Sequence, residues 1–177
     1  MLEGEIDIIE LAKKGDQDAF ATLYDHYHTP IYRFVVLKVS LRHEAEDLAH
    51  EVFLSAWRNL PRFKSRGFPF SSWLYKIARN RVIDYYRTAK PKVDLEDIPQ
   101  GLTQDDVDHE ADLNLDFDLK RVKAAMQTLS PDQQDVLILR YVEDYSPKEI
   151  SKILKKKEGT IRIIQHRAIK ALKEKIS

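Results

Sequence analysis

The stretch LSPDQQDVLILRYVEDYSPKEISKILKKKEGTIRIIQHRAIKAL (residues 129–172) uses the same device twice to begin a helix. Ser130 and Ser146 are each followed by a proline, and Gln133 or Glu149 stands three residues after the serine. A serine before a helix, a proline at the first position and a glutamine or glutamate at the third form a capping box. We therefore expect one helix from each proline and, after the turn KKKEG, a third helix that is basic.

Apolar residues in this stretch recur at the three- and four-residue spacing of helices that bury one face. The short helix after Ser146, the tight turn and the basic helix that follows match a helix-turn-helix, whose last helix lies in the DNA major groove. The first two helices carry Val136, Leu137, Leu139, Tyr141, Ile150, Ile153 and Leu154. The inward stripe of the third is expected to contain Ile161, Ile164, Ala168, Ala171 and Leu172.

The composition favours helices over sheets. Of 177 residues, 43% are hydrophobic, 33% are charged and only five are glycine. The absence of cysteine excludes a disulfide framework, a thiolate metal site and a cysteine nucleophile. The acidic start MLEGEIDIIELAKKGD is unlike a signal peptide, and no run of about 18 apolar residues is present to span a membrane. We expect a cytoplasmic, all-α protein.

A net charge of zero conceals a strong segregation of charge along the chain. Residues 62–92 contain nine basic side chains and one acidic one, residues 93–118 contain ten acids and no Lys or Arg, and residues 148–177 contain ten basic and three acidic side chains. Two basic blocks around an acidic one are typical of two polyanion-binding surfaces joined by a segment that repels polyanions.

The first half of the chain also has helical periodicity, beginning with Ile6, Ile9, Leu11 and Ala12 and continuing with Phe20, Leu23, Tyr24 and Tyr27. Pro30 fits the first turn of a new helix over PIYRFVVLKVSL, although the β-branched residues of this segment would also suit a strand. The segment RHEAEDLAHEVFLSAWRNL is strongly amphipathic. Its apolar face contains Ala45, Leu48, Val52, Phe53, Ala56 and Leu60.

The next helix is expected within GFPFSSWLYKIARNRVIDYYR (residues 67–87), after the basic loop PRFKSRGFP, and begins near Ser71 or Ser72. Arg81 and Asp84 fall on or beside its core arc, so we expect them to pair with each other or with Glu46 and Asp47. The core arc contains Phe70, Trp73, Leu74, Ile77, Ala78 and Tyr85. The far side contains Ser72, Lys76, Arg79, Asn80, Ile83 and Arg87.

These observations predict two small helical domains joined by an acidic linker. The first domain covers residues 1–92, the linker residues 93–117 and the helix-turn-helix domain residues 118–177. Residues 88–117 contain two prolines, a glycine and nearly all of the acidic block, which is typical of a linker with short helical turns near its end.

The whole chain resembles a bacterial RNA polymerase sigma factor of the extracytoplasmic-function (ECF) group of the sigma-70 family. AEDLAHEVFLSAWRNLPRF resembles the family's region 2.2, and FSSWLYKIARNRVIDYYR resembles regions 2.3 and 2.4. LSPDQQDVLILRYVEDYSPKEISKIL followed by EGTIRIIQHRAIKAL resembles region 4. The order and spacing of such blocks over about 150 residues is a specific signal.

The resemblance assigns a polymerase-binding surface to region 2.2. In the family, this helix packs against a coiled coil of the largest catalytic subunit of core RNA polymerase. The matching positions are Asp47, Leu48, His50 and Glu51. His50 stands where glutamine is common, and its imidazole can still hydrogen-bond to a partner.

The resemblance also assigns the basic loop and the far side of the helix after it to the promoter −10 element. Such proteins hold the non-template strand open and take one flipped base into a loop pocket, which requires phosphate clamps and stacking walls. Asn80 has the donor and acceptor needed to read a base edge. The residues expected on this surface are Arg62, Lys64, Arg66, Phe68, Phe70, Lys76, Arg79, Asn80 and Arg87.

In region 4, the basic helix is expected in the major groove of the −35 element. This sequence departs from the family there, because Lys156 and Lys157 replace the usual apolar and capping residues of the turn. Ile164 stands where arginine is frequent, so it is expected to join the inward stripe. Gln165 is then suited to read adenine and Ile163 to touch a thymine methyl. The residues expected to contact DNA are Lys157, Thr160, Arg162, Ile163, Gln165, His166 and Arg167.

Two readings of the acidic linker stay open: it imitates RNA in the polymerase's exit channel, or it is a solvated tether. The partners that the resemblance implies are core RNA polymerase, promoter DNA and an anti-sigma factor. The alternative function is a helix-turn-helix regulator that binds duplex DNA without polymerase.

Catalysis is not expected. His43, Glu44 and His50 lack the spacing of a zinc-protease helix, and no glycine-rich phosphate loop occurs. We therefore expect no metal and no cofactor.

Overall fold

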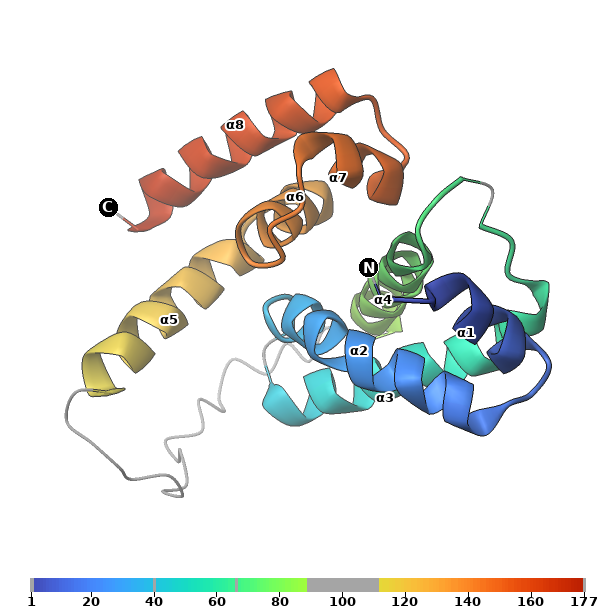
Figure 1. The fold of residues 1–177 in the computed structure, drawn as a ribbon. Coiled ribbons are helices and arrows are strands. Elements are labelled where there is room, and N and C mark those ends of the chain that lie inside the picture. The colour runs from blue at the N-terminus through green and yellow to red at the C-terminus, as the bar shows by residue number, and fades with distance from the viewer. Residues whose placement is uncertain (1, 40, 66, 89–111, 177) are drawn as a thin grey trace.

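The computed structural model describes residues 2–39, 41–65, 67–88 and 112–176, with the side chains of 112–119 excepted. Every regular element in these ranges is a helix, as the sequence predicts (Figure 1). In chain order the elements are α1 (Glu5–Lys13), α2 (Gln17–Val36), α3 (Arg42–Asn59), the 3₁₀ helix η1 (Leu60–Arg62), α4 (Phe70–Thr88), α5 (Asp112–Gln127), α6 (Pro131–Tyr141), α7 (Pro147–Leu154) and α8 (Glu158–Ile176).

Helices α1 to α4 form the N-terminal domain, in which α2, α3 and α4 pack against one another and α1 packs on α2. The predicted apolar face of α3 is confirmed, because all six of its residues are buried. The periodicity at the start of the chain is only half right. Ile9 and Ala12 are buried, whereas Ile6 is 78% exposed and Leu11 is also exposed.

Pro30 lies in the interior of α2 and not in the first turn of a new helix, which corrects the prediction. A proline inside a helix removes one hydrogen bond to the carbonyl four residues earlier, here that of His26. His26 is exposed, so water can satisfy this carbonyl. Ile31 and Val35 are fully buried beyond the proline. Burial of such side chains is worth about 1.5–3 kcal/mol each, which offsets the cost of the proline.

Helices α5 to α8 form the C-terminal domain, and both predicted capping boxes are confirmed. The Ser130 hydroxyl accepts from the Gln133 amide, and the Ser146 hydroxyl accepts from the Glu149 amide. Helix α7 ends at Leu154, the next residue Lys155 has a φ of 54° in the left-handed region, and α8 begins at Glu158. Helix α5 begins at Asp112, so the end of the predicted linker is part of a helix; residues 93–111 lie outside the described ranges.

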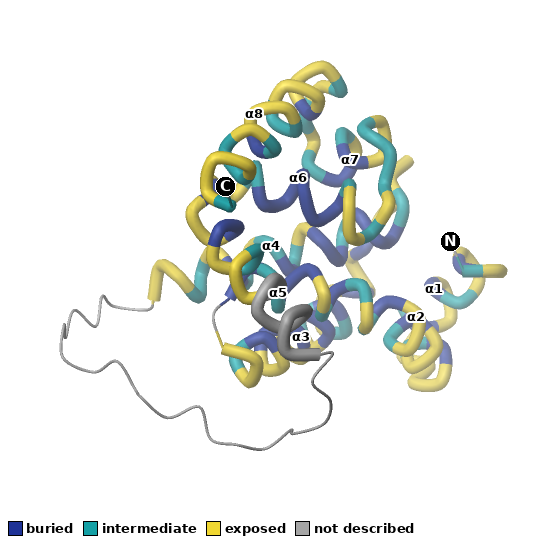
Figure 2. Tube along the Cα trace, turned by 90° about the vertical axis from the view of Figure 1, so that its left-hand side faces the viewer, coloured by how far each residue is buried: buried dark blue, intermediate teal, exposed yellow. Residues whose placement is uncertain are grey.

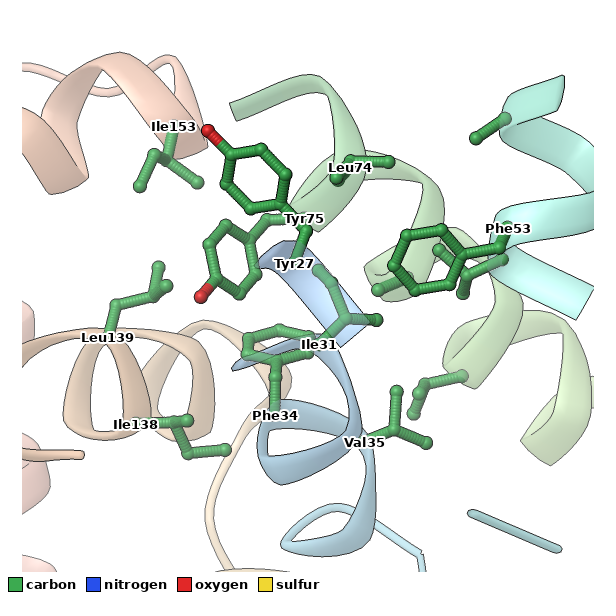
Figure 3. Packing of buried hydrophobic residues seen from close by; sticks show 14 of the residues in the cluster. Tyr27, Ile31, Phe34, Val35, Phe53, Leu74, Tyr75, Ile138, Leu139 and Ile153 are labelled. Carbon is green, nitrogen blue, oxygen red and sulfur yellow. The ribbon is translucent and has the colours of Figure 1, made fainter. Parts of the chain in front are cut away.

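The two domains pack directly on each other. Helix α6 lies against α2, and α7 lies against α4. Figure 3 shows Leu139 and Ile153 of the C-terminal domain facing the rings of Tyr27 and Tyr75 of the N-terminal domain. The buried side chains therefore form one continuous cluster across the domain boundary. In Figure 2, α6 is largely buried at the centre, whereas the outer side of α8 is exposed.

No helix in the described ranges has the length and apolar content needed to cross a membrane.

Candidate polymerase and nucleic-acid interfaces

The outer side of α3 presents a stripe of exposed side chains. Asp47, His50 and Glu51 are exposed, with His50 and Glu51 about one helical turn after Asp47. Leu48 is only 7% exposed and packs in the core, so its predicted place on the polymerase surface is corrected. Leu54 continues the stripe and is 48% exposed. Its position three residues after Glu51 could have revealed it.

An apolar hollow of about 300 Å³ borders this stripe between α2 and α3. Its walls include two aromatic pairs whose rings meet at an angle: the ring centroids of Phe20 and Trp57 lie 4.8 Å apart, and those of Tyr24 and Phe53 lie 4.7 Å apart. The full lining is Gln17, Phe20, Tyr24, His50, Phe53, Leu54 and Trp57. A polar stripe beside an apolar hollow can receive a partner that combines charge with a large apolar side chain.

The outer edge of α4 forms the second surface. Lys76, Asn80 and Arg87 are exposed along it, four and seven residues apart, with Ile83 between them. The spacing places these side chains in one row along the helix. Arg87 pairs with Asp84 at 3.1 Å. This row corresponds to the polar and basic side predicted from the sequence.

A groove of about 690 Å³ opens beside this row, between the loop before α4 and helix α7. Five cationic side chains line it, and its lining within the described residues includes no acid. The cations are Arg62, Lys64, Lys76, Lys152 and Lys155. Ser72 also lines the groove, but its hydroxyl is buried and has no hydrogen-bond partner among the described residues. Cations around an apolar floor suit a ligand with phosphate and a ring.

The aromatic wall of the groove differs from the prediction. Phe68 is 38% exposed and available for stacking, whereas Phe70 is only 2% exposed. The Phe70 ring is enclosed by Phe63 and Trp73, with centroids 5.4 and 5.5 Å away. Phe70 therefore belongs to the core arc and not to the DNA surface. Phe63 and Trp73 line the groove instead.

The remaining loop positions add two points. Ser72 is buried, although the sequence placed it on the polar side, and Arg66 lies outside the described residues. Phe63 was missed as a lining residue; its place in PRFKSRGFP, between the cations of a loop, was the available signal.

Arg79 turns away from the row and toward the C-terminal domain. Its guanidinium donates to Asp132 at 2.6 Å and to Asp135 at 2.5 Å, both on α6. Arg81 makes a long ion pair of 3.9 Å with Glu51, and not with Asp84, Glu46 or Asp47 as predicted. Arg79, which the sequence placed on the DNA-binding side of α4, is therefore paired with acids from the other domain.

Asp135 is fully buried and also accepts a hydrogen bond from the ammonium of Lys38, at the end of α2. Burial lowers the pKa of Lys38 below its usual value, and attraction to Asp135 opposes that shift. Nearby, the guanidinium of Arg33 donates two 2.8 Å hydrogen bonds to the carboxylate of Glu143, which raise the arginine pKa. Lys38 and Glu143 were not singled out from the sequence.

The third surface is the outer side of α8. Lys157, Thr160, His166 and Arg167 are exposed, and Ile163 is 54% exposed. This side faces away from the N-terminal domain, because α8 packs on α5, α6 and α7 (Figure 1).

Two further residues of α8 have partners within the C-terminal domain. Arg162 is exposed and donates to Glu158 at 2.8 Å. Ile161 is fully buried and Ile164 partly buried, as expected. Gln165 is half-buried and donates to the Tyr141 hydroxyl at 2.9 Å, so it is less outward than predicted.

Comparisons with known proteins agree on both domains. Residues 23–91 match the family described as Sigma-70 region 2, and residues 125–174 match Sigma-70, region 4. The chain is 33% identical to the ECF RNA polymerase sigma factor SigW of Bacillus subtilis, over 95% of this chain and 94% of SigW. It is 31% identical to the ECF RNA polymerase sigma factor BldN of Streptomyces coelicolor, over 94% of this chain but only 64% of the length of BldN.

Two solved structures share the fold. One is CnrH in complex with the cytosolic domain of CnrY, with a TM-score of 0.72 at 20% identity over 94% of this chain and 93% of that one. The other is the sigma factor RpoE of Bartonella quintana in complex with the anti-sigma factor NepR, with a TM-score of 0.67 at 25% identity over 89% of this chain and 96% of that one.

Proposed function

The chain belongs to the ECF group of the sigma-70 family of RNA polymerase sigma factors, and from this premise we propose how its three surfaces divide the work of transcription initiation. As a sigma factor it joins core RNA polymerase and directs it to promoters. It contributes binding and orientation, and the polymerase carries out the chemistry. Its place of action is the cytoplasm, where polymerase and DNA meet.

The groove beside α4 is the observation that carries the assignment of the −10 element. Arg62, Lys64 and Lys76 surround its mouth and clamp phosphates of the displaced non-template strand. Phe68 stacks on a base that is flipped out of the strand. Asn80 reads a neighbouring base edge from the exposed row.

The stripe on α3 binds core polymerase. Asp47, His50 and Glu51 offer a carboxylate, an imidazole and a second carboxylate to a basic partner surface. Leu54 and the apolar hollow beside it extend this contact, because an apolar anchor surrounded by charges is the usual anatomy of a specific interface.

The outer side of α8 reads the −35 element. Arg162 and Thr160 lie in the first turns of the helix, where phosphate and base contacts occur in helix-turn-helix proteins. Ile163 meets a thymine methyl, and Gln165 reads adenine after it leaves Tyr141. An anti-sigma factor is a further partner, by likeness to RpoE in its complex with NepR.

Run-off transcription with core polymerase on genomic fragments tests this function and finds the promoter. We expect transcripts only when the protein is present, and co-purification with core polymerase at moderate salt. Duplex DNA binding without any binding to core polymerase would instead support a polymerase-independent regulator and reject the sigma function.

A further inference from the structure

Arg79 has two competing partners. Its position on α4 places it beside the row of Lys76 and Asn80 that we assign to the −10 element. In the folded chain, however, both of its hydrogen bonds go to carboxylates on α6 of the other domain. The Nε and Nη2 groups of Arg79 donate to these two carboxylates, so the charge of the guanidinium is already paired before a DNA phosphate can reach it.

The acids that hold Arg79 belong to a compact network at the domain boundary. Asp132 binds Arg79 on one side and Lys156 at 3.0 Å on the other. Asp135 binds Arg79 and Lys38, and both Asp135 and Lys38 are buried. Arginine and lysine around carboxylates reproduce the contacts that the same cations make with phosphates.

A second contact repeats this polarity. The fork of Arg33 on α2 binds both oxygens of Glu143, whose side chain is only 4% exposed, just after α6. In both contacts the N-terminal domain supplies the cations and the C-terminal domain the carboxylates. At the boundary, carboxylates of one domain therefore pair with cations of the other in the way that phosphates pair with cations at a nucleic-acid interface.

We propose that α6 is an intramolecular competitor of promoter DNA, in which Asp132 and Asp135 occupy Arg79 in place of −10 phosphates and hold the two domains closed. This inference rests on the proposed −10 function of α4. In the closed form the −35 surface on α8 stays accessible while the −10 surface is incomplete. Binding of the −10 strand requires Arg79 to leave α6.

Promoter geometry supports the need for opening. The two elements are centred about 25 base pairs apart, which at about 3.4 Å per pair is about 85 Å of duplex. In the closed chain α4 and α8 both pack on α7. The path from α4 through α7 to α8 is two helix-to-helix distances of about 10 Å each. Even when the length of α8, about 28 Å, is added, the sum is well below that span. The closed chain cannot contact both elements at once.

The network is also suited to a reversible closure. Desolvation offsets most of the attraction in a buried ion pair, so such a pair specifies how surfaces meet more than how tightly. Leu139 and Ile153 supply apolar contact across the boundary beside this network. Polymerase can therefore separate the domains by binding each of them on its own surface.

The test compares Asp135→Asn and Asp132→Asn with Asp144→Asn in the full-length protein. Asp144 is 98% exposed in the same domain, so its replacement removes the same charge without touching the boundary. The probe is a labelled single-stranded oligodeoxynucleotide of the −10 non-template strand, taken from the promoter that run-off transcription identifies. We expect Asp135→Asn to tighten binding of this probe about tenfold and Asp132→Asn to tighten it less, whereas Asp144→Asn binds like the wild type.

A distance measurement gives an independent readout. The chain has no cysteine, so Arg58→Cys on α3 and Lys175→Cys on α8 provide unique sites for a fluorescence energy-transfer pair. Transfer should fall in Asp135→Asn and in Asp132→Asn, and it should not change in Asp144→Asn. If Asp135→Asn unfolds because Lys38 is left unpaired, the partly exposed Asp132 decides the matter alone.

The outcomes separate the two proposals. Unchanged probe affinity and unchanged energy transfer in both boundary variants would overturn the competitor, even with a wild type that binds the probe and supports transcription. A wild type that neither binds core polymerase nor supports run-off transcription would reject the sigma function itself.

Discussion

The two helices that we assign to DNA binding, α4 and α8, are both basic and both amphipathic, yet they are placed differently in the fold. The outer side of α8 faces away from the rest of the molecule, so Thr160 and His166 are exposed in the free chain. Helix α4 is enclosed by α2, α3 and α7, and Arg79 is held by carboxylates of α6. Basic sequence alone therefore does not establish which surface is available to DNA.

The difference follows from what each surface has to bind. A recognition helix meets duplex DNA as a preformed shape and needs only exposure. A site for an open strand must hold unpaired bases, which are absent until polymerase has begun to melt the promoter. An Arg79 that stays paired with internal acids until then cannot contribute its charge to binding other polyanions.

The largest expected effect concerns the polymerase surface on α3, which we expect to act separately from both DNA surfaces. We expect Asp47→Lys to weaken binding to core polymerase about 100-fold or more, because it reverses a charge within a specific interface. Glu46→Lys is the matched control, since Glu46 is exposed on the same helix and makes only a surface pair with Arg42. Co-purification and run-off transcription measure the effect. Equal losses in both variants would place the polymerase contact elsewhere.

The second prediction tests the difference between α4 and α8 by replacing Arg79. We expect Arg79→Ala to weaken binding of the −10 strand about tenfold in the holoenzyme, where a charged contact to phosphate is lost. In the free chain the loss should be smaller, because one lost DNA contact is offset by one lost contact to α6. Lys76→Ala is the control, since Lys76 is exposed and should lose equally in both forms. The same loss for Arg79→Ala in both forms would contradict an occupied guanidinium.

Local signals in the sequence predicted much of this fold. The capping boxes at Ser130 and Ser146 and the apolar face of α3 depend on residues within a few positions of one another, so short-range patterns reveal them. Pro30 was misplaced because its helix-breaking tendency is local, whereas burial of Ile31 and Val35 in the tertiary core outweighs it.

The fate of single surface residues was not predictable in the same way. A helical wheel places Arg79 on the polar side of α4, but its partners lie 53 and 56 positions away, and Lys38 meets Asp135 across 97 positions. Phe70 shows the opposite case. It follows the basic loop that we assign to the −10 element, yet it lies on the core arc. Its burial depends on how Phe63 and Trp73 pack over it.

The third prediction concerns α8, where exposure makes the effect independent of polymerase. We expect Arg162→Ala to weaken −35 duplex binding several-fold and to lower the slope of log affinity against log salt by about 0.9, the value for one lost phosphate contact. Lys175→Ala, an exposed cation in the last turn of the same helix, is the control and should change neither. Fluorescence anisotropy over a salt series measures both quantities. Unchanged affinity and slope would remove Arg162 from the DNA contacts.

The smallest effect concerns α7, which packs on both α4 and α8 and so links the two surfaces. Ser146→Ala should lower the free energy of unfolding by about 1 kcal/mol, because it removes the cap of this helix. Ser151→Ala is the control, since the Ser151 hydroxyl bonds a carbonyl within the helix and caps nothing. Urea denaturation of the full-length chain measures both variants, and equal stability of Ser146→Ala and wild type would contradict the cap.

Acid should reduce the difference in the free energy of unfolding between wild type and Ser146→Ala. Hydrogen bonds from Ser146 lower the pKa of Glu149 below its usual 4.5. A carboxylate whose pKa is lower in the folded state stabilises the fold above its unfolded pKa and loses that contribution as pH falls through the folded value. The stability gap between wild type and Ser146→Ala should therefore be widest near neutral pH and narrow below 4.5. A gap that widens in acid would show that the Glu149 carboxylate is not part of the cap.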